Sequence, residues 1–397
     1  MARKITVAVI FGGRSAEHDV SIVTALSSVI RPLELFQKYD IQTVYVAKDG
    51  RWFWDGKLKD MALFSSGKID DFTASNQPAG VVFDGGFTLT KLAGLSKRPI
   101  FQKIDVVFPA MHGTFGEDGS LMGLLDMAGV PYVGSGLSAS AVAMDKVLSK
   151  QLAVANDIPV TKFLAFTRDT IKLDLAQVLF DIHKRLHYPL FIKPAHLGSS
   201  IGISKAKNET ELANGLEVAM HYDDKIIVEE GVTDLIEVTL PIIGNEILQP
   251  GLLERPMTHA EDFFDFETKY MRGGKKGGKI VSSKALGNSG GAHGYSQLPA
   301  DLPKQLYVRA ESLGQRVYKI LGCSGIARVD MLIDNKSKNV YFNEVNPLPG
   351  SLYAHNFRKA GISSMEMVDQ LIGYALERHA QRQELATTFA TSFLKQF

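Results

Sequence analysis

The feature of the sequence that most restricts its fold is an apolar run near the start. Ile5–Phe11 is continuously apolar and stops at Gly12 and Gly13. A short run of this kind is typical of a buried parallel strand. Val20–Ile30 then has helical spacing, and Ile41–Val46 is a second strand-like run, so the opening predicts a β-α-β unit. The loop after the first strand would lie at the carboxyl edge of the sheet, where small ligands bind.

Length and composition narrow the class of protein. At roughly 150 residues per domain, the 397 residues predict two or three domains. The formal net charge is only +1, which argues against nucleic-acid binding through bulk charge. The single cysteine, Cys323, excludes an internal disulfide framework and a cysteine-based zinc site. No apolar stretch approaches the roughly 18 residues of a membrane span, so we expect a soluble, cytoplasmic protein that binds no membrane.

The later parts of the chain alternate strand and helix patterns. A strand is expected at 104–109 and a helix at 119–128. One helix is then expected from Ser138 to about Asn156, and a compact α+β unit follows it. Strands are expected at 158–166, 188–193 and 225–229, with a helix at 209–220; after Glu237 come a helix at 303–321, a strand pair at 326–333 and 340–345, and a last helix at 363–383.

The clearest chemistry lies on the expected strand pair near the C-terminus. Because side chains alternate along a strand, Arg328 and Asp330 share one face, and so do Glu344 and Asn346. An antiparallel register across the five-residue loop sets Asp330 opposite Glu344. Oxygen ligands of this kind suit Mg²⁺. The alternative is a salt-bridged surface hairpin, but two facing carboxylates repel each other unless a cation lies between them.

Four other segments carry weaker signals. Lys193 ends an apolar strand, and Gly198–Gly202 would let backbone amides approach phosphate oxygens, unless its glycines and serines are simple turn residues. Residues 262–270 precede a Gly-, Lys- and Ser-rich stretch at 271–296, which predicts a closing lid or, alternatively, a core strand with charged edges. Residues 17–19 and 112–118 follow expected parallel strands, where small ligands bind.

Taken together, the motifs resemble the D-alanine–D-alanine ligase family of ATP-grasp enzymes. The resemblance runs from about residue 4 to 375. It rests on motifs in the same order along the chain: Phe-Gly-Gly-x-Ser-Ala-Glu-His-Asp-Val-Ser from Phe11, His-Gly-Thr-Phe-Gly-Glu-Asp-Gly-Ser from His112, Met-Asp-Lys from Met144, Lys-Pro-Ala-His-Leu-Gly-Ser-Ser from Lys193, Phe-Asp-Phe-Glu-Thr-Lys-Tyr from Phe264, Ala-Arg-Val-Asp from Ala327 and Asn-Glu-Val-Asn-Pro-Leu-Pro-Gly from Asn343.

The resemblance implies an α/β and α+β architecture, an ATP-grasp fold preceded by a parallel-sheet domain. The implied domains are an N-terminal substrate-binding domain at 1–135, a central ATP-grasp subdomain at 136–231, and a C-terminal subdomain at 232–397 with a lid at about 254–297. It also implies an ATP-dependent ligase that joins two D-alanines through an acyl phosphate for peptidoglycan precursors. Members of the family commonly form homodimers, so the resemblance also implies a homodimer.

The resemblance also assigns roles to individual residues. Asp330, Glu344 and Asn346 would hold Mg²⁺ or Mn²⁺. The phosphates of ATP would contact Lys146, Lys193, Lys269, Ser199 and Ser200. The adenine–ribose slot would be lined by Glu229, Val232 and Glu237.

Other residues are implied to act on the amino acids. Glu17 would bind the first ammonium group, linked to Ser199 and Tyr270, with His112 near the carboxyl group. The guanidinium of Arg328 and the backbone N–H of Gly350 would stabilise the tetrahedral oxyanion.

One segment departs from the family pattern. After Gly350 the family commonly has an aromatic residue or Met, then Thr, then hydroxyl side chains, whereas this chain has Ser351-Leu-Tyr-Ala-His-Asn. We expect Ser351 or His355 to take over the contact with the second substrate. D-Serine, D-lactate or another amino acid therefore remains an alternative acceptor to D-alanine.

Overall fold

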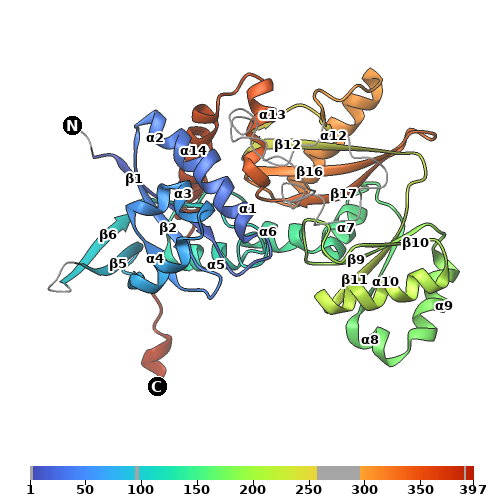
Figure 1. The fold of residues 1–397 in the computed structure, drawn as a ribbon, viewed down its shortest axis with the longest axis horizontal. Helices are drawn as coiled ribbons and strands as arrows, with labels where there is room; N and C mark the ends of the chain where they lie inside the picture. The colour runs from blue at the N-terminus through green and yellow to red at the C-terminus, as the bar shows by residue number, and fades with distance from the viewer. Residues whose placement is uncertain (1–2, 94–97, 257–295, 389) are drawn as a thin grey trace.

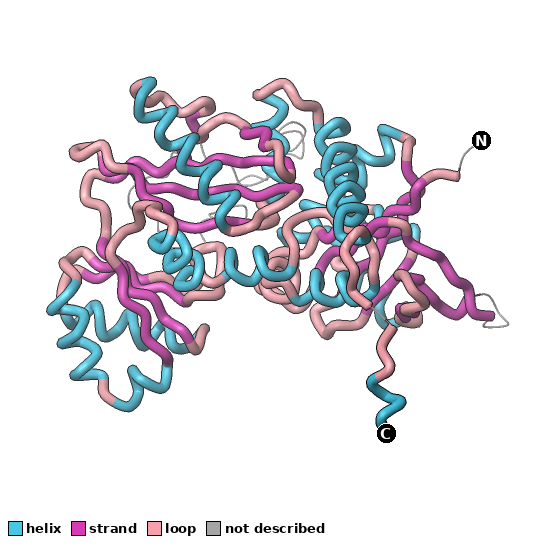
Figure 2. The backbone as a smooth tube through the Cα atoms, turned by 180° about the vertical axis from the view of Figure 1, so that it is seen from behind, coloured by secondary structure: helices cyan, strands magenta, loops and turns pink. Residues whose placement is uncertain are grey.

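The computed structural model describes residues 3–93, 98–256, 296–388 and 390–397 (Figure 1). Seen from behind, the N-terminal sheets lie on one side of the molecule, and two further sheets lie on the other, one above the other (Figure 2). Lys269 and Tyr270 and most of the expected lid lie outside the described residues. Among the residues described, no helix combines the length and apolar character needed to cross a membrane.

The N-terminal sheet confirms the predicted β-α-β opening. Its order is β3-β2-β1-β7, and β1 pairs in parallel with both β2 and β7. Between β1 and β2 the chain is helical from His18 to Phe36, with a π-helical stretch in its middle. The bounds are β1 Ile5–Gly12, α1 His18–Val23, η1 Thr24–Ile30, α2 Arg31–Phe36, β2 Tyr39–Val46, β3 Trp52–Trp54 and β7 Val106–Pro109.

The stretch before β7 forms a small second sheet. Its order is β4-β5-β6, with β4 Gly80–Val82, β5 Phe87–Ala93 and β6 Arg98–Ile104. The expected single strand at 104–109 is therefore divided at Asp105. The reason is that the Asp105 carboxylate accepts the Thr6 N–H at 2.8 Å, so this residue closes the end of the sheet. Helix α5 (Ser120–Ala128) follows β7, close to the helix expected there.

The single helix expected from Ser138 to Asn156 is wrong, because the structure has two helices. Helix α6 is Leu137–Met144 and α7 is Lys146–Ala155. Asp145 between them is extended, and its carboxylate accepts the N–H groups of Val147 and Leu148 at 2.9 and 3.0 Å. Asp145 thus caps α7 and starts a new helix.

The middle sheet is antiparallel, in the order β10-β9-β11-β8. Apolar side chains of three helices pack with those of the strands in one core, which places the helices on one face (Figure 1). The other face is turned toward the C-terminal sheet. The bounds are β8 Phe163–Thr167, α8 Arg168–Leu173, α9 Leu175–Arg185, β9 Leu190–Pro194, β10 Ser204–Ala206, α10 Glu209–Tyr222 and β11 Lys225–Glu230.

The C-terminal sheet is also antiparallel, in the order β13-β12-β16-β17. Helix α12 packs against it, whereas the long final helix α14 returns to the core of the N-terminal sheet. The bounds are β12 Leu235–Gly244, β13 Leu248–Pro250, β14 Arg255–Pro256, β15 Ser296–Gln297, α12 Lys304–Ile320, β16 Gly325–Asp334, β17 Val340–Asn346, η4 Gly350–Tyr353, α13 Ala354–Lys359 and α14 Ser364–Gln383.

Candidate functional site

An acidic pair lies on β16 and β17, in the register that the sequence predicts. Asp330 pairs with Glu344, and Arg328 pairs with Asn346. Burial alternates along β16: the side chains of Val329 and Met331 are buried, whereas those of Arg328 and Asp330 are partly exposed. The polar face of the strand pair therefore carries two facing carboxylates.

A cation accompanies each of these carboxylates. Arg328 donates to both oxygens of Asp330, from Nε at 2.7 Å and from Nη2 at 2.5 Å, and Asn346 donates to Oδ2 at 3.1 Å. Lys146 Nζ lies 3.3 Å from Glu344 Oε2. Burial alone would raise the pKa of Glu344, but the nearby charges of Lys146, Lys193 and Arg328 outweigh it and lower the pKa to about 2. This corner of the site is therefore charged at neutral pH.

Two buried lysines share one buried carboxylate beside the acidic pair. Lys150 Nζ lies 2.9 Å from Glu229 Oε1, and Lys193 Nζ lies 2.6 Å from Glu229 Oε2. Burial opposes ionisation of Glu229, yet the two lysines lower its pKa to about 2. With three charged groups in the cluster, its net charge is +1, and Lys193 also approaches Asn343 Oδ1 at 3.4 Å.

Lys150 was not among the site residues predicted from the sequence. Its side chain is fully buried in α7, where a lysine is costly unless it is paired. A signal was available, because Lys150 comes one helical turn after Lys146 and so shares its face. Glu229 was expected in the adenine slot, and in this structure its carboxylate is engaged by lysines.

The glycine-rich loop after β9 approaches the N-terminal sheet closely. Ser199 donates a hydrogen bond to Glu17 Oε1, and Lys146 Nζ donates to the carbonyl oxygen of Leu197 at 2.7 Å. A Cβ atom on Gly198 would lie 3.2 Å from Glu17 Oε2, which explains the glycine there. Ser199 and Ser200 have φ angles of 54° and 61°, so the loop is held in the left-handed region.

Glu17 lies in a buried acidic corner at the carboxyl edge of the N-terminal sheet. Burial and then the charge of Glu117 raise its pKa, and the hydrogen bond from Ser199 and the charges of His112 and Lys146 lower it by less. A bound ammonium group would restore the balance of charge in this corner.

Glu117, which the sequence analysis did not single out, joins two distant segments. Its Oε2 accepts the Gly113 N–H at 2.6 Å, and its Oε1 accepts the Leu348 N–H at 3.2 Å. His112 Nδ1 lies 3.8 Å from Oε2. The signal for Glu117 was its place in the quoted motif that begins at His112, although the motif did not reveal the contact with Leu348.

The segment that departs from the family pattern has an unusual backbone. Ser351, Leu352 and Tyr353 have φ angles of 51° or 52°, three consecutive left-handed residues of which none is glycine. The Ser351 N–H donates to Thr24 Oγ1 at 2.9 Å, and His112 Nε2 lies 2.9 Å from the same oxygen. Thr24 therefore links His112 to the residue that follows Gly350.

Aromatic and acidic side chains surround this segment. The Arg328 guanidinium lies 5.1 Å from the centre of the Tyr353 ring, within the range of a cation–π contact. His355 Nε2 lies 2.8 Å from Glu254 Oε2, and this carboxylate is buried. Burial alone would raise the pKa of Glu254, but the hydrogen bonds and charge of His355 and the hydrogen bonds of its neighbours outweigh this effect and lower the pKa. The expected contact of His355 or Ser351 with the second substrate stays a prediction.

The remaining nucleotide-side residues lie around the start of β12. Glu237 is on β12 opposite Leu332, and Val232 is in the turn after β11. The pKa of Lys193 is raised despite its burial, because Glu229, Glu344 and Glu237 all act on it. The described residues thus gather Lys146, Lys193, Glu237, Asp330 and Glu344 around one region between the middle and C-terminal sheets.

Two family models together match most of the chain. A family model described as the D-Ala–D-Ala ligase N-terminus matches residues 6–135, and one described as the C-terminus of that ligase matches residues 152–373. D-alanine–D-alanine ligase A of Bradyrhizobium diazoefficiens is 37% identical over 98% of this chain and 100% of its own length. The D-alanine–D-alanine ligase of Acetivibrio thermocellus is 35% identical over 96% of this chain and 98% of its own length.

Solved structures of similar proteins have the same fold. The D-alanine–D-alanine ligase of Coxiella burnetii superposes with a TM-score of 0.75 at 27% identity, over 96% of this chain and 97% of that one. The VanG D-Ala:D-Ser ligase of Enterococcus faecalis gives a TM-score of 0.72 at 29% identity, over 94% of this chain and 100% of that one. The two structures differ in the second amino acid that their names give.

Proposed function

The chain belongs to the D-alanine–D-alanine ligase family, and we propose that it joins two D-alanines with ATP as the energy source. The dipeptide would serve the synthesis of peptidoglycan precursors. The observation that carries the proposal is the pair Asp330 and Glu344, which face each other beside Lys146 and Lys193 in a chain that matches the ligases over nearly its whole length.

The reaction needs activation because a carboxylate has no leaving group that an amine can displace. A carboxylate oxygen of the first D-alanine attacks the γ-phosphorus of ATP, and the bond to the bridging oxygen of ADP breaks. The amine of the second D-alanine then attacks the carbonyl carbon of the acyl phosphate and loses a proton. Inorganic phosphate leaves as the peptide bond forms, so the products are the dipeptide, ADP and phosphate.

The polar face of β16 and β17 fits a divalent cation. Asp330, Glu344 and Asn346 offer only oxygen ligands from side chains, which is the set that Mg²⁺ prefers. The low pKa of Glu344, about 2, keeps its carboxylate ionised and able to bind a cation. When bound, Mg²⁺ would neutralise charge on the phosphates of the nucleotide.

The chain's own cations are arranged for the nucleotide's phosphates. Lys146 and Lys193 reach the same region from α7 and β9, and the net charge of the Lys150–Glu229–Lys193 cluster remains +1. Ser200 and the amides of the glycine-rich loop would add hydrogen bonds, with Lys269 from the lid. Val232 and Glu237 would border the adenine–ribose slot.

The buried acidic corner is suited to the first D-alanine. Glu17 would accept its ammonium group, with Ser199 and Tyr270 holding the carboxylate in place and His112 near the substrate's carboxyl group. Arg328 and the Gly350 N–H would donate to the oxyanion of the tetrahedral intermediate. Loss of one such donor typically lowers the rate by about 10²- to 10³-fold.

The acceptor is tested with a panel of second substrates. Phosphate release is measured with D-alanine alone and with D-alanine plus D-serine, D-lactate or other amino acids. We expect turnover with D-alanine alone and D-alanyl-D-alanine as the product. No turnover with D-alanine alone, together with turnover when D-serine is added, would favour the activity named for the VanG protein and would contradict the proposal.

Three further expectations concern the oligomeric state, the location in the cell and the domain boundaries. We expect a homodimer, which light scattering after size-exclusion chromatography checks, and a cytoplasmic location, which cell fractionation checks. The domain boundaries near residues 135 and 231 remain predictions, and limited proteolysis would test them.

A further inference from the structure

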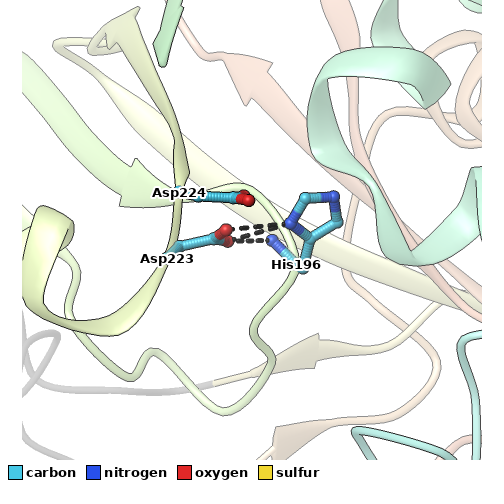
Figure 3. Close-up of side chains that lie close together, drawn as sticks. All are labelled: His196, Asp223 and Asp224. Carbon is cyan, nitrogen blue, oxygen red and sulfur yellow. Dashed lines mark hydrogen bonds and ion pairs between the residues drawn. The ribbon is translucent and has the colours of Figure 1, made fainter. Parts of the chain in front are cut away.

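His196 lies two residues after the end of β9, just before Gly198–Gly202, and it contacts two acidic side chains from different parts of the chain. Its Nδ1 lies 2.9 Å from Asp223 Oδ1, and its backbone N–H donates to Asp223 Oδ2 at 2.8 Å (Figure 3). On the other side of the ring, Nε2 lies 3.3 Å from Asp145 Oδ2. One imidazole therefore bridges the end of α10 and the start of α7.

Asp145 makes this bridge relevant to the phosphate groups. Its carboxylate caps α7, whose first residue is Lys146. The same carboxylate also accepts a hydrogen bond from Lys225 Nζ at 2.5 Å. Lys146 Nζ in turn donates to the carbonyl oxygen of Leu197, the residue after His196. The loop and Lys146 are thus tied together twice, once through this carbonyl group and once through His196 and Asp145.

We infer that His196 is a positioning residue, which holds the glycine-rich loop in register with Lys146 by bridging Asp223 and Asp145. The inference rests on the proposed function, because both elements would contact the nucleotide's phosphates. His196 itself would touch neither nucleotide nor amino acid. It would act by keeping two phosphate-binding elements at a fixed separation before ATP arrives.

A metal site is a competing explanation of the same cluster. One ligand atom of each of His196, Asp223 and Asp224 lies within 4.8 Å of the others. However, the Asp223 oxygens already accept the His196 N–H, the imidazole and the Lys225 N–H. A cation would have to displace these bonds, so hydrogen bonding explains the cluster with fewer losses.

The charge of the imidazole supports the bridging geometry. The groups that face it are Asp145, Asp223 and Asp224, and Lys225 Nζ contacts the same Asp145 oxygen as the ring. The hydrogen bonds that the ring donates to Asp145 and then to Asp223 raise the pKa of His196 to about 9, against the opposing effect of burial. The ring therefore carries two N–H donors at neutral pH, one for each carboxylate.

Two conservative variants separate the two links. The amide of asparagine lies near the place of Nδ1, so His196→Asn keeps the contact with Asp223 and loses Asp145. The amide of glutamine lies near the place of Nε2, so His196→Gln keeps the contact with Asp145 and loses the side-chain bond to Asp223. The matched control is His183→Asn on α9, where His183 bonds to Tyr188 in the connection between α9 and β9, away from the glycine-rich loop.

The readout is the Kd of the Mg²⁺ complex of the non-hydrolysable ATP analogue AMP-PNP, measured by calorimetry between pH 7 and 10. We expect both His196 variants to raise the Kd by about fivefold to tenfold at pH 7, since each loses a charge-assisted bond, and the control to leave it unchanged. In the unaltered chain the Kd should rise as the pH passes about 9, and this step should be absent from both variants. Thermal melts confirm that each variant is folded.

Several outcomes would overturn the inference. If either variant binds AMP-PNP as the unaltered chain does, the bridge is not needed, and a flat pH profile of the unaltered chain counts against it equally. If Zn²⁺ raises the melting temperature of the unaltered chain but not of His196→Asn, the cluster is a metal centre. If the unaltered chain does not bind AMP-PNP, both the ATP-dependent function and the inference are overturned. If the unaltered chain and the His196 variants bind AMP-PNP equally well, only the inference is overturned.

Discussion

Asp330 lies opposite Glu344 on two antiparallel strands, and a cation accompanies each carboxylate. Facing carboxylates repel each other, and burial makes the repulsion stronger. Arg328 and Lys146 relieve it in the structure described here. Both side chains lie on the polar face of one strand pair, and we propose that the same pair binds a divalent cation.

Glu344→Gln should therefore lower kcat by at least about 100-fold, because one of the two ionised ligands is lost while the shape of the side chain is kept. The concentration of Mg²⁺ needed for half-maximal rate should rise as well. Both quantities come from phosphate-release assays at a series of Mg²⁺ concentrations.

Asp334→Asn is the matched control, because Asp334 is the last residue of β16, the strand that pairs with β17, and its carboxylate accepts hydrogen bonds within the turn that follows. It makes the same chemical change outside the polar pair, and we expect both quantities to stay within about twofold. An unchanged Mg²⁺ requirement in Glu344→Gln would remove the metal assignment.

Much of the acidic pair could be predicted because it depends on local rules. Strand alternation fixes which side chains of 328–333 share a face. The expected pairing of Asp330 with Glu344 is confirmed, although the hairpin closes at Ile333 and Val340 and a shift of one residue between Asp330 and Met331 brings the two carboxylates opposite each other. The buried strand at the start of the chain was equally clear. These features depend on neighbours in sequence, which pattern analysis can see.

The rest of the site depends on contacts between distant residues. Glu117 accepts a hydrogen bond from the N–H of Leu348, and Thr24 accepts one from the N–H of Ser351. The periodicity of the sequence around these residues does not indicate either contact. Asp145 divides an otherwise continuous helical pattern because its carboxylate prefers to cap a helix, which propensity alone does not decide. The roles of Lys269 and Tyr270 still rest on sequence alone.

Lys150→Met should lower the free energy of unfolding by about 3 kcal/mol, because it takes one lysine from a fully buried carboxylate. Urea unfolding at pH 7 measures this. The control is Lys207→Met, since Lys207 is exposed and we expect a change within about 0.5 kcal/mol. Equal stability of the two variants would show that the Lys150–Glu229 pair contributes nothing.

The acid limb of stability should also depend on Glu229. Its pKa in the folded chain is about 2, below its ordinary value of 4.5, so its contribution is present above pH 4.5 and is lost as the pH falls toward 2. Lys150→Met removes one of the charges that lower this pKa. We therefore expect the variant to lose less stability than the unaltered chain between pH 4.5 and 3, as measured by urea unfolding at each pH. Parallel pH profiles would contradict the prediction.

Thr24→Val should impair the reaction without weakening nucleotide binding. Valine keeps the shape of this fully buried side chain but removes the oxygen that accepts the Ser351 N–H. An unpaired buried N–H costs about 1–3 kcal/mol, and the segment that carries the Gly350 N–H would shift to relieve it. We expect kcat to fall by about tenfold with the Kd for AMP-PNP unchanged, while Thr24→Ser, which keeps the hydroxyl group, stays close to the unaltered chain. If the valine variant turns over at the normal rate, or if the serine variant is equally slow, then Thr24 does not position the residues after Pro349 through its hydroxyl group.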